Sequence, residues 1–386
     1  MNVQPLALYA HFPWCVQKCP YCDFNSYTLR ETLPEERYVD VLIRDLEAQA
    51  GALAGRPRVS IFLGGGTPSL FSPAAIGRLI TRARELLGFA VDVEITLEAN
   101  PGTIERGRFS EYRAAGVTRV SLGAQSFDPR QLQLLGRIHS ADETRRAAEE
   151  LHAAGLANFN LDLMYALPGQ TAADAEADVI AALELQPAHV SQYHLTIEPG
   201  TVFAAAPPVQ PVDEVVEEML QRSLQRLGAA GFEQYEVSGY ARAGARCTHN
   251  LNYWNFGDYL GIGAGAHGKL SDYSLELVQR TQQTREPRRY LAADPASLAK
   301  KPVAVRDLPF EFAMNGFRLV EGFSDQRFTG STGLPVAVLE RALAPLVDRG
   351  LVDRGPGNWR ATPKGFRFLN EILVELLPEA GPVAVT

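Results

Sequence analysis

Cysteine is scarce in this chain, with 4 among 386 residues, and only 4 Met and 3 Trp accompany it. So few cysteines exclude a disulfide framework and fit a reducing compartment. No stretch approaches the ~18 uninterrupted apolar residues of a membrane-spanning helix, and the N-terminus lacks the basic and apolar regions of a signal peptide. The formal charge of -8 argues against an obligate nucleic-acid binder. These absences predict a cytoplasmic globular protein with no transmembrane segment and no specific nucleic-acid partner.

Three of the four cysteines, Cys15, Cys19 and Cys22, fall within eight residues, directly after an apolar run. A disulfide needs only two thiols, and a structural zinc site normally takes four protein ligands. Three close thiolates on a loop therefore favour an iron-sulfur cluster in which one iron is left open. Ordinary buried thiols are the alternative, but they have no reason to gather in so short a stretch.

Short apolar runs alternate with amphipathic segments up to about residue 197. The expected strands are Leu6–His11, Val59–Gly64, Val91–Leu97, Val117–Gly123, Asn158–Leu163 and Val190–Leu195. Repeated strand-helix units of this kind predict an α/β fold with a buried parallel sheet, either closed as a barrel or open and doubly wound. In a barrel, functional residues lie at the carboxyl ends of the strands.

Chemically unusual residues do follow these runs. Gly64 to Thr67 follow the second run, Glu98 ends the third, and Gln125 and Asp162 come at the ends of the fourth and fifth. Glycines let backbone groups approach a ligand closely, although a tight turn is the alternative reason for the triplet. The polar side chains either contact a ligand or pair among themselves at the barrel mouth.

The spacing CxxxCxxC, with an aromatic residue before the last cysteine, resembles the radical S-adenosylmethionine (SAM) superfamily. The resemblance implies a partial (β/α)6 barrel, a [4Fe-4S] cluster on Cys15, Cys19 and Cys22, and SAM bound at the open iron. With GGGTPS, EANP, GAQSF and DLMYALPGQT, essentially the whole chain is similar to the oxygen-independent coproporphyrinogen III dehydrogenase group. The positions that match SAM contacts of that group are Tyr9, Gly65, Gly66, Thr67, Glu98, Gln125, Arg137 and Asp162.

Two features resemble the heme chaperone (HemW-type) branch of that group more than its decarboxylating enzymes. The enzymes carry a further cysteine where this chain has Phe24. Residues 247–254, CTHNLNYW, resemble the HNxxYW signature of the chaperone branch. That resemblance implies His249 as an axial heme ligand, with the two aromatic residues of the motif covering the porphyrin. The alternative for residues 247–254 is a loop that packs on the barrel and binds no heme. Cys247 is expected either to lie near heme or to be a small buried residue.

Three domains are expected. Residues 1–205 would form the barrel, residues 206–305 an extension with the HNxxYW loop, and residues 306–386 a mostly helical winged-helix-like domain. Within the extension, Gly257 to Leu270 are expected as a glycine-rich loop and Arg280 to Arg306 as a basic connector. The last domain is predicted from helices at Glu311 to Leu319 and Pro335 to Asp348, followed by a hairpin around Gly355 to Asn358.

The sequence therefore predicts a heme chaperone that binds a [4Fe-4S] cluster, SAM and heme. It would pass heme to an acceptor protein, a membrane-associated acceptor being one option. The alternative is an enzyme that decarboxylates coproporphyrinogen III with SAM-derived radicals. A winged-helix regulator that senses the cluster is a third hypothesis, which the acidic charge disfavours. Phe24 and the HNLNYW stretch favour the chaperone over the enzyme.

Overall fold

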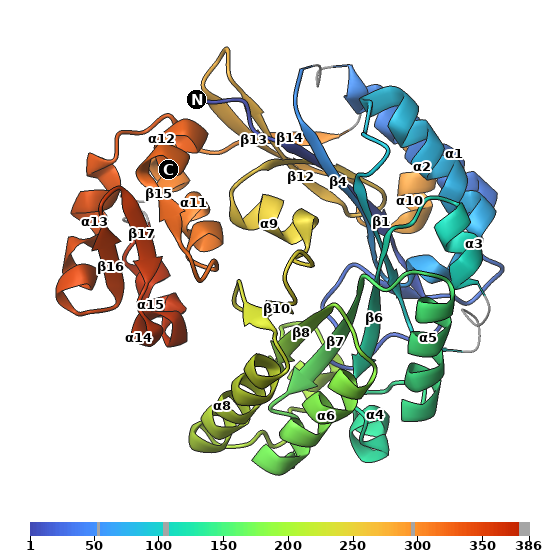
Figure 1. The fold of residues 1–386 in the computed structure, drawn as a ribbon. Helices are drawn as coiled ribbons and strands as arrows, with labels where there is room; N and C mark the ends of the chain where they lie inside the picture. Colours follow the sequence, from blue (N-terminus) through green and yellow to red (C-terminus); the bar gives the residue numbers. More distant parts are fainter. Residues whose placement is uncertain (52–54, 103–107, 295–297, 378–386) are drawn as a thin grey trace.

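A computed structural model describes residues 1–51, 55–102, 108–294 and 298–377. Its main element is a sheet that curves around a central space (Figure 1). Among the described residues the strand order is β14-β13-β12-β11-β1-β4-β5-β6-β7-β8-β10-β9. The six expected strands form a consecutive parallel series: β1 (Leu6–Phe12), β4 (Arg58–Gly65), β5 (Glu94–Ala99), β6 (Arg119–Gln125), β7 (Phe159–Tyr165) and β8 (His189–His194). The prediction of an α/β fold built on a partial barrel is confirmed.

The third strand begins later than expected. Val91 is 86% exposed and precedes the strand, whose pairing with β4 starts where Glu94 lies opposite Ser60. An apolar side chain raises the expectation of a strand, but a strand begins only where its backbone finds a partner. Val91 therefore belongs to the turn before β5.

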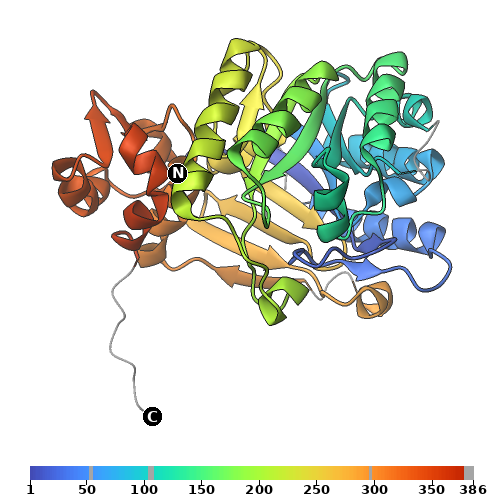
Figure 2. The same ribbon diagram turned by 90° about the horizontal axis from the view of Figure 1, so that it is seen from below.

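Helices follow the parallel strands and pack mainly on the outer face of the sheet (Figures 1 and 2). They are α1 (Glu35–Ala50), α2 (Pro73–Leu87), α3 (Phe109–Ala114), α5 (Ala141–Ala153), α6 (Ala172–Glu184) and α8 (Asp213–Ala229), together with the short α4 (Pro129–Leu134) and α7 (Val202–Ala205). Local signals set their ends: the Ser72 side chain accepts a hydrogen bond from Ala75 N at the start of α2, and Gly88 ends that helix with φ 69°. The main core lies between these helices and the sheet.

Further strands extend the sheet at both ends. β11 (Asp258–Ile262) pairs in parallel with β1, and β12 (His267–Asp272), β13 (Leu277–Gln282) and β14 (Ala299–Pro302) continue in antiparallel order. β10 (Gly239–Ala241) and β9 (Glu233–Gln234) extend the other end. The expected loop at Gly257 to Leu270 and the expected connector at Arg280 to Arg306 are therefore wrong, because both contain strands, and the second also contains α10 (Pro287–Ala292). Glycine serves close strand packing here: a Cβ on Gly261 would lie 2.0 Å from the His267 carbonyl oxygen.

A buried ion pair ties β11 to β12. Asp258 and Lys269 are 0% and 1% exposed, and the Lys269 ammonium donates to Asp258 Oδ1 at 2.7 Å. Ser271 donates its backbone N–H and its hydroxyl to the same carboxylate, at 2.8 and 2.9 Å. A buried carboxylate with this many donors remains charged, so the pair holds the two strands in register.

One helix lies inside the curve of the sheet. This helix, α9 (Thr248–Trp254), lies in the central space beside β4 (Figure 1). The expected HNxxYW loop is thus a short helix, and the side chain of His249 on this helix is buried. Residues 206–305 supply both this helix and the additional strands.

The C-terminal region forms its own core beside the barrel (Figure 1). Its elements are α11 (Leu308–Gly316), β15 (Phe323–Ser324), α12 (Asp325–Thr332), α13 (Ala337–Asp348), β16 (Val352–Gly355), β17 (Asn358–Ala361), α14 (Pro363–Arg367) and α15 (Leu369–Val374). Helix, strand, two helices and a hairpin follow in winged-helix order, with strand order β15-β17-β16. Ion pairs join the region to the barrel, one between Arg280 and Glu311 and one of 3.2 Å between Arg318 and Glu236.

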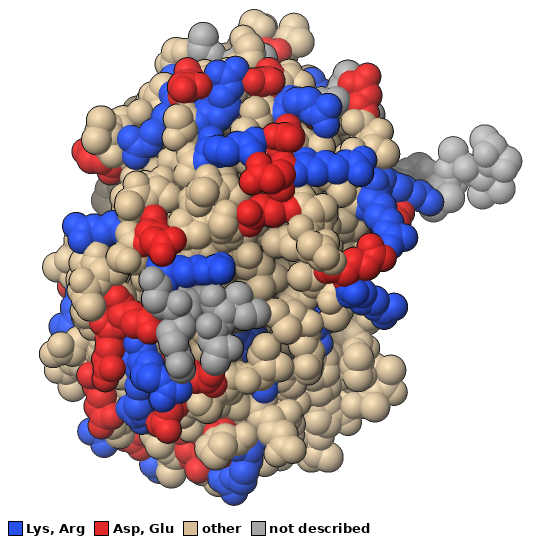
Figure 3. Space-filling view, turned by 90° about the vertical axis from the view of Figure 1, so that its right-hand side faces the viewer, with Lys and Arg blue, Asp and Glu red and all other residues tan. Residues whose placement is uncertain are grey.

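Charges of both signs share the helical side of the molecule. Basic and acidic side chains are interspersed over the described residues of the face in Figure 3. On α1 and α2, Arg82 pairs with Glu47 at 2.7 Å and with Glu85 at 2.9 Å. Within the described ranges, no helix is both long enough and apolar enough to cross a bilayer.

Candidate functional site

The three clustered cysteines lie on the loop that follows β1. The loop opens and closes with two short paired strands, β2 (Trp14–Cys15) and β3 (Tyr27–Thr28). Between them, Cys22 N donates to the Cys19 carbonyl oxygen at 3.2 Å. All three thiols are free and partly exposed. The loop, residues 15–26, is called the cysteine loop below.

Side chains from distant segments hold the cysteine loop in place. The Asn25 amide donates to the carbonyl oxygens of Ala264 and Arg285, both at 2.9 Å. The Asn25 carbonyl oxygen faces His11 Nε2 at 2.9 Å. The shape of the loop therefore depends on β1 and on the segments around β12 and β13.

A cavity of about 360 Å³ opens beside the cysteine loop at the carboxyl ends of the parallel strands. Ten of the predicted site residues line it: Cys15, Cys19, Cys22, Gly65, Gly66, Thr67, Glu98, Gln125, Arg137 and Asp162. These residues come from the ends of four parallel strands, β4 to β7, from the cysteine loop and, for Arg137, from the segment after α4, so the strand-end rule gathers them around one space. Its volume suits a ligand the size of a nucleoside with an amino-acid tail.

Glycine is required on the wall of this cavity formed by the end of β4. Gly65 has φ 116°, and a Cβ there would lie 2.4 Å from the His11 ring. A Cβ on Gly66 would lie 2.6 Å from the carbonyl oxygen of Trp14. Only glycine lets the backbone approach the cysteine loop this closely, which leaves its polar groups at the cavity surface.

Two of the four carboxyl groups that line the cavity, those of Glu98 and Asp162, are poorly solvated; the others belong to Asp23 and Glu198. Burial raises the pKa of Glu98 to about 8, and the negative charge of Asp162 also raises it. The N–H of Gly65, which donates to Glu98 Oε2 at 2.9 Å, acts in the opposite direction. Burial also raises the pKa of Asp162, against the hydrogen bonds from Ser121 and Asn160. A cation placed between these carboxyls would favour their ionised forms. The cavity is therefore suited to a positively charged ligand.

Arg137 joins the cysteine loop to the strand ends. Its Nη1 donates to Cys19 Sγ at 3.4 Å and its Nη2 to the Gly123 carbonyl oxygen at 2.9 Å. Asn100 accepts a hydrogen bond from the same guanidinium and donates to Thr67 Oγ1 at 3.0 Å. Sequence reasoning did not select Asn100, although its place two residues after Glu98 at a strand end was a usable signal.

Gln125 ends β6 in a conformation that residues with a side chain rarely adopt, with φ 67°. Such strain persists only where the surroundings impose it, and it gathers at functional sites. Ser121, on the same face of β6, and Tyr193, near the end of β8, also line the cavity and were not selected from the sequence. Phe24 lies at the cavity as well, with 60% of its surface exposed.

Two predicted site residues lie outside the described lining of this cavity. The hydroxyl of Tyr9 contacts His11 Nδ1 at 2.9 Å, and its ring lies near Phe62 and His249, with ring centroids 6.2 and 6.4 Å away. His249 is on α9, 1% exposed, and its Nδ1 contacts Ser60 Oγ at 2.9 Å. Its ring stacks on Phe62 with centroids 4.8 Å apart. The structure therefore places both side chains inside the barrel, below the cavity.

The remaining nitrogen of His249 is unusual. Nε2 is buried and has no hydrogen-bond partner among the described residues. Burial lowers the pKa of His249 to about 3, so the imidazole is neutral at pH 7. In the tautomer whose Nδ1–H donates to Ser60 Oγ, Nε2 has a free lone pair, and this neutral form of imidazole is the one that ligates iron.

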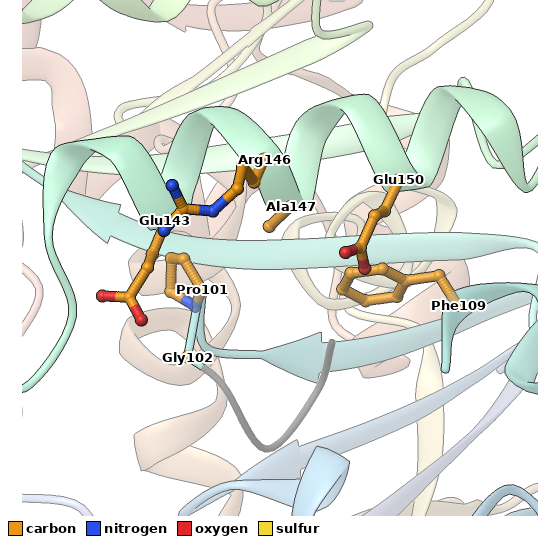
Figure 4. A pocket seen from close by; sticks show the side chains of 7 residues that line it. All are labelled: Pro101, Gly102, Phe109, Glu143, Arg146, Ala147 and Glu150. Atoms are coloured by element: carbon orange, nitrogen blue, oxygen red, sulfur yellow. The ribbon is translucent and has the colours of Figure 1, made fainter. Parts of the chain in front are cut away.

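A smaller hollow lies between α5 and the segment after β5 (Figure 4). Its volume is about 10 Å³, which has room for one water molecule and no nucleoside. Glu143, on its edge, already accepts the N–H and the hydroxyl of Ser140 at the start of α5, at 2.8 and 3.1 Å. The hollow is a packing feature of the helix start.

The cysteine loop also differs from a site for one ion. Within the described ranges, no three His, Cys, Asp or Glu side chains lie close enough together to hold a single metal ion. In a [4Fe-4S] cluster, by contrast, each thiolate binds a different iron, so the sulfur atoms lie farther apart. All three thiols line the same cavity, where a cluster of this kind would be held.

A parallel half-barrel with a three-cysteine loop at its strand ends defines a radical SAM protein. The family model "Radical SAM superfamily" matches residues 9–180, and the model "HemN C-terminal domain" matches residues 303–368. Membership of the superfamily implies a [4Fe-4S] cluster and SAM.

Full-length relatives narrow the assignment. The "Heme chaperone HemW" of Escherichia coli (strain K12) is 46% identical over 379 residues, covering 98% of this chain and 100% of that protein. The protein of the same name from Haemophilus influenzae is 46% identical over 98% of this chain and 99% of its own length, and that from Mycobacterium tuberculosis is 36% identical over 98% and 96%. The chain therefore belongs to the HemW family.

A solved structure has the same fold. Coproporphyrinogen III oxidase (HemN) from Escherichia coli, described as a radical SAM enzyme, matches with a TM-score of 0.80 over 97% of this chain and 90% of its own. The sequence identity is 24%, so this likeness concerns the fold alone. The shared architecture extends through the C-terminal region.

Proposed function

We propose that this protein is a heme chaperone that carries a [4Fe-4S] cluster and SAM, binds heme and transfers it to an acceptor protein. The observation that carries the proposal is the full-length similarity to proteins named heme chaperone HemW, at 46% identity. The position of α9 supports it, because the helix that bears the HNxxYW signature lies inside the barrel, against β4, one of the strands whose ends form the cavity. A protein built this way has a ligand imidazole and a cofactor cavity on one scaffold.

The cysteine loop would hold the cluster through Cys15, Cys19 and Cys22. Burial raises the pKa of Cys15 and Cys22, so these thiols lose their protons when they bind iron and stay protonated without it. The guanidinium of Arg137, already in contact with Cys19, offsets part of the negative charge of the thiolates. When bound, such a cluster would supply an iron able to take SAM as a ligand.

SAM would occupy the cavity beside this loop. Its ammonium and sulfonium groups are cations, and Glu98 and Asp162 are the two buried carboxyls that line the space, with Asp23 and Glu198 also on its lining. The backbone of Gly65 and Gly66 can approach the methionyl group because these positions have no Cβ. Thr67, Gln125 and Arg137 complete the proposed contacts, and Tyr9 supports the cavity from below, through His11.

His249 is the proposed axial ligand of heme. Its free Nε2 and neutral ring suit iron, but the side chain is 1% exposed, so heme reaches it only when α9 moves away from Phe62 and the sheet. Tyr253 lies against the His249 ring, with centroids 4.7 Å apart, and would move with the helix to cover a porphyrin face.

The acceptor is proposed to be a heme-requiring protein, with a membrane-associated protein as one option, and the site of action to be the cytoplasm. A free Cys247 thiol and a cluster that the other three cysteines would bind are suited to a reducing compartment. The basic residues around α10 and β14, such as Arg288, Lys300 and Lys301, offer a surface for an anionic partner or for heme propionates.

The alternative function is oxidative decarboxylation of coproporphyrinogen III. The specific observation against it is Phe24, which lies exposed at the cavity where the resemblance places a further cysteine in the enzymes. The fold alone does not separate the two functions, because the coproporphyrinogen oxidase shares it.

One pair of assays on anaerobically reconstituted protein tests the proposal. Heme is titrated while its absorption is followed, and coproporphyrinogen III is supplied with SAM and a reductant in parallel. We expect heme uptake near one equivalent and no decarboxylated product. His249→Ala should weaken heme binding at least tenfold, whereas His152→Ala, an exposed histidine on α5, should not. Catalytic decarboxylation would contradict the chaperone function. Equal heme binding by the two histidine variants would contradict His249 as the heme ligand.

A further inference from the structure

Below the SAM cavity, a continuous series of polar side chains runs through part of the barrel interior. Asp162 lines the cavity, and the amide of Asn160 donates to its Oδ1 at 2.9 Å. Asn160 Oδ1 contacts His189 Nδ1 at 2.6 Å, and His189 Nε2 contacts the hydroxyl of Tyr235 at 2.9 Å. The backbone N–H of Cys247 donates to that hydroxyl at 3.4 Å. The series thus runs from the cavity to Cys247, the N-cap residue of α9.

The neighbours determine which way each hydrogen bond points. Asn160 uses its amino group for Asp162 and for Ser121 Oγ at 2.8 Å, so its oxygen must accept and His189 Nδ1 must carry the proton. Burial, aided by the charge of Arg119, lowers the pKa of His189 well below its usual value, so the ring is neutral. Its Nε2 therefore accepts the Tyr235 hydroxyl proton. Every donor in the series points toward the carboxylate of Asp162.

Such an arrangement responds as a unit. Hydrogen bonds in a chain polarise one another when all of them point the same way in a water-poor interior. Asn160, His189, Tyr235 and Cys247 are each at most 2% exposed, so water does not compete for these bonds. A change in the charge of Asp162 therefore changes the strength of each bond down to Cys247.

The far end of the series holds the start of α9. Cys247 is the N-cap of the helix, and its backbone N–H is fixed by Tyr235. Glu94 holds the same turn from the other side, accepting the N–H of His249 at 3.2 Å. Tyr235, between β9 and β10, and Glu94, on β5, thus contact the first turn of α9, and Ser60 on β4 contacts the His249 ring, so these groups together keep His249 in its buried position.

We propose that His189 and Tyr235 couple the SAM cavity to α9, so that SAM bound at Asp162 holds His249 in its buried position and weakens heme binding. The cationic groups of SAM keep Asp162 ionised, and an ionised carboxylate accepts stronger hydrogen bonds than a protonated one. The statement that bound SAM weakens heme binding rests on the proposed function, in which His249 ligates heme. His189 and Tyr235 are positioning residues, since neither lines the cavity and neither is a proposed ligand.

By linkage, the effect is reciprocal: the factor by which SAM weakens heme binding equals the factor by which heme weakens SAM binding. Coupling between two sites in one protein is typically about 5- to 150-fold. We therefore expect SAM to raise the heme Kd at least ~5-fold, and to slow hydrogen exchange of the α9 amides by a similar factor.

Tyr235→Phe removes one oxygen atom and breaks the series. The matched control is Tyr240→Phe, a buried tyrosine on β10 at which the same atom is lost outside the series. The full-length, cluster-loaded variants are compared with the parent by hydrogen exchange and by heme titration, each with and without SAM. In Tyr235→Phe the SAM effect on both readouts should fall below ~2-fold, whereas Tyr240→Phe should keep the effect of the parent.

His189→Gln provides a second break if Tyr235→Phe does not fold, and it should lose the same coupling. If these side chains only stabilise the interior, replacing them would lower the unfolding temperature. The ratio of the heme Kd with SAM to the heme Kd without SAM, and the same ratio for α9 exchange, would then stay as in the parent. Equal SAM effects in the parent and in both series variants would overturn the inference. If the parent binds no heme, the proposed function fails, while the exchange of α9 still decides whether the two sites are coupled.

Discussion

Glu98 should make SAM binding depend on pH in a defined direction. Its pKa is raised to about 8 by burial in the SAM-free cavity. At pH 7, one unit below that value, roughly one-tenth of these carboxyls are ionised. A cationic ligand binds the ionised form, so binding at pH 7 must first remove a proton from most molecules.

The magnitude follows from this proton. Below the pKa, the Kd for SAM should rise about tenfold for each unit by which the pH falls, and above pH ~8 it should level off. Binding at pH 7 should release roughly nine-tenths of a proton from Glu98. The sign is that of a group whose pKa is higher in the free cavity than in the complex: affinity increases with pH.

Titration calorimetry in two buffers with different ionisation heats measures the proton release directly. The amino group of SAM titrates in the same range, so the parent protein alone does not isolate the contribution of the carboxyl. Glu98→Gln supplies that background, because it keeps the shape of the side chain and removes the titration. We expect the variant to bind more weakly above pH 8 and to have a shallower pH dependence. Parallel pH profiles for the two proteins would refute the reasoning.

Three further changes have expected outcomes that can be measured. Cys22→Ser should remove the brown chromophore and the bound iron, whereas Cys247→Ser should keep both, and equal iron in the two variants by anaerobic analysis would contradict the assignment of the cysteine loop. Gly66→Ala places a methyl group 2.6 Å from a backbone oxygen and should lower the free energy of unfolding by about 1–3 kcal/mol, whereas Gly228→Ala, in open space on α8, should raise it by about 0.5–1 kcal/mol in guanidinium unfolding. Lys269→Met removes one of the two cations that pair with the buried carboxylate of Asp258, Arg56 being the other, and should cost about 1.5–3 kcal/mol in the same assay; a loss below ~1 kcal/mol would show that the Lys269 pair does not hold β11 to β12.

The parallel strands could be predicted because strands buried on both faces are continuously apolar. The glycine-rich segment could not, because glycine disfavours strands and its purpose here is a contact with a distant residue. A Cβ on Gly268 would lie 2.3 Å from Thr281 Oγ1, on the next strand. Such a requirement exists only once β12 and β13 have paired, and no local pattern contains it.

The helix at residues 248–254 could not be predicted from the sequence for a related reason. Seven residues make about two turns, too few for a helical period to stand out from a loop. The helix is held by Ser60 and Glu94, which lie more than 150 residues earlier in the chain. Packing of this range determines both its conformation and the burial of His249.

Within the candidate site, the rule that functional residues gather at strand ends led to Glu98 and the glycines of β4. It did not lead to Asn100, whose importance comes from bridging Thr67 and Arg137 across the cavity. Tyr9 was selected through resemblance alone, and its contacts with His11 could be seen only in three dimensions. Residue types at strand ends can thus be predicted, while the contacts between them cannot.

The position of β1 has a consequence for the order of events during translation. One partner of this strand, β4, is made soon after it, but the other, β11, spans residues 258–262. The carbonyl acceptors that hold Asn25 are on residues 264 and 285 of a 386-residue chain. A nascent polypeptide therefore presents its three thiols to the cell long before the ribosome has delivered the groups that shape their loop. Loading with iron and sulfide then belongs to the finished chain, and products truncated before residue 285 carry the cysteines without the contacts that hold them in place.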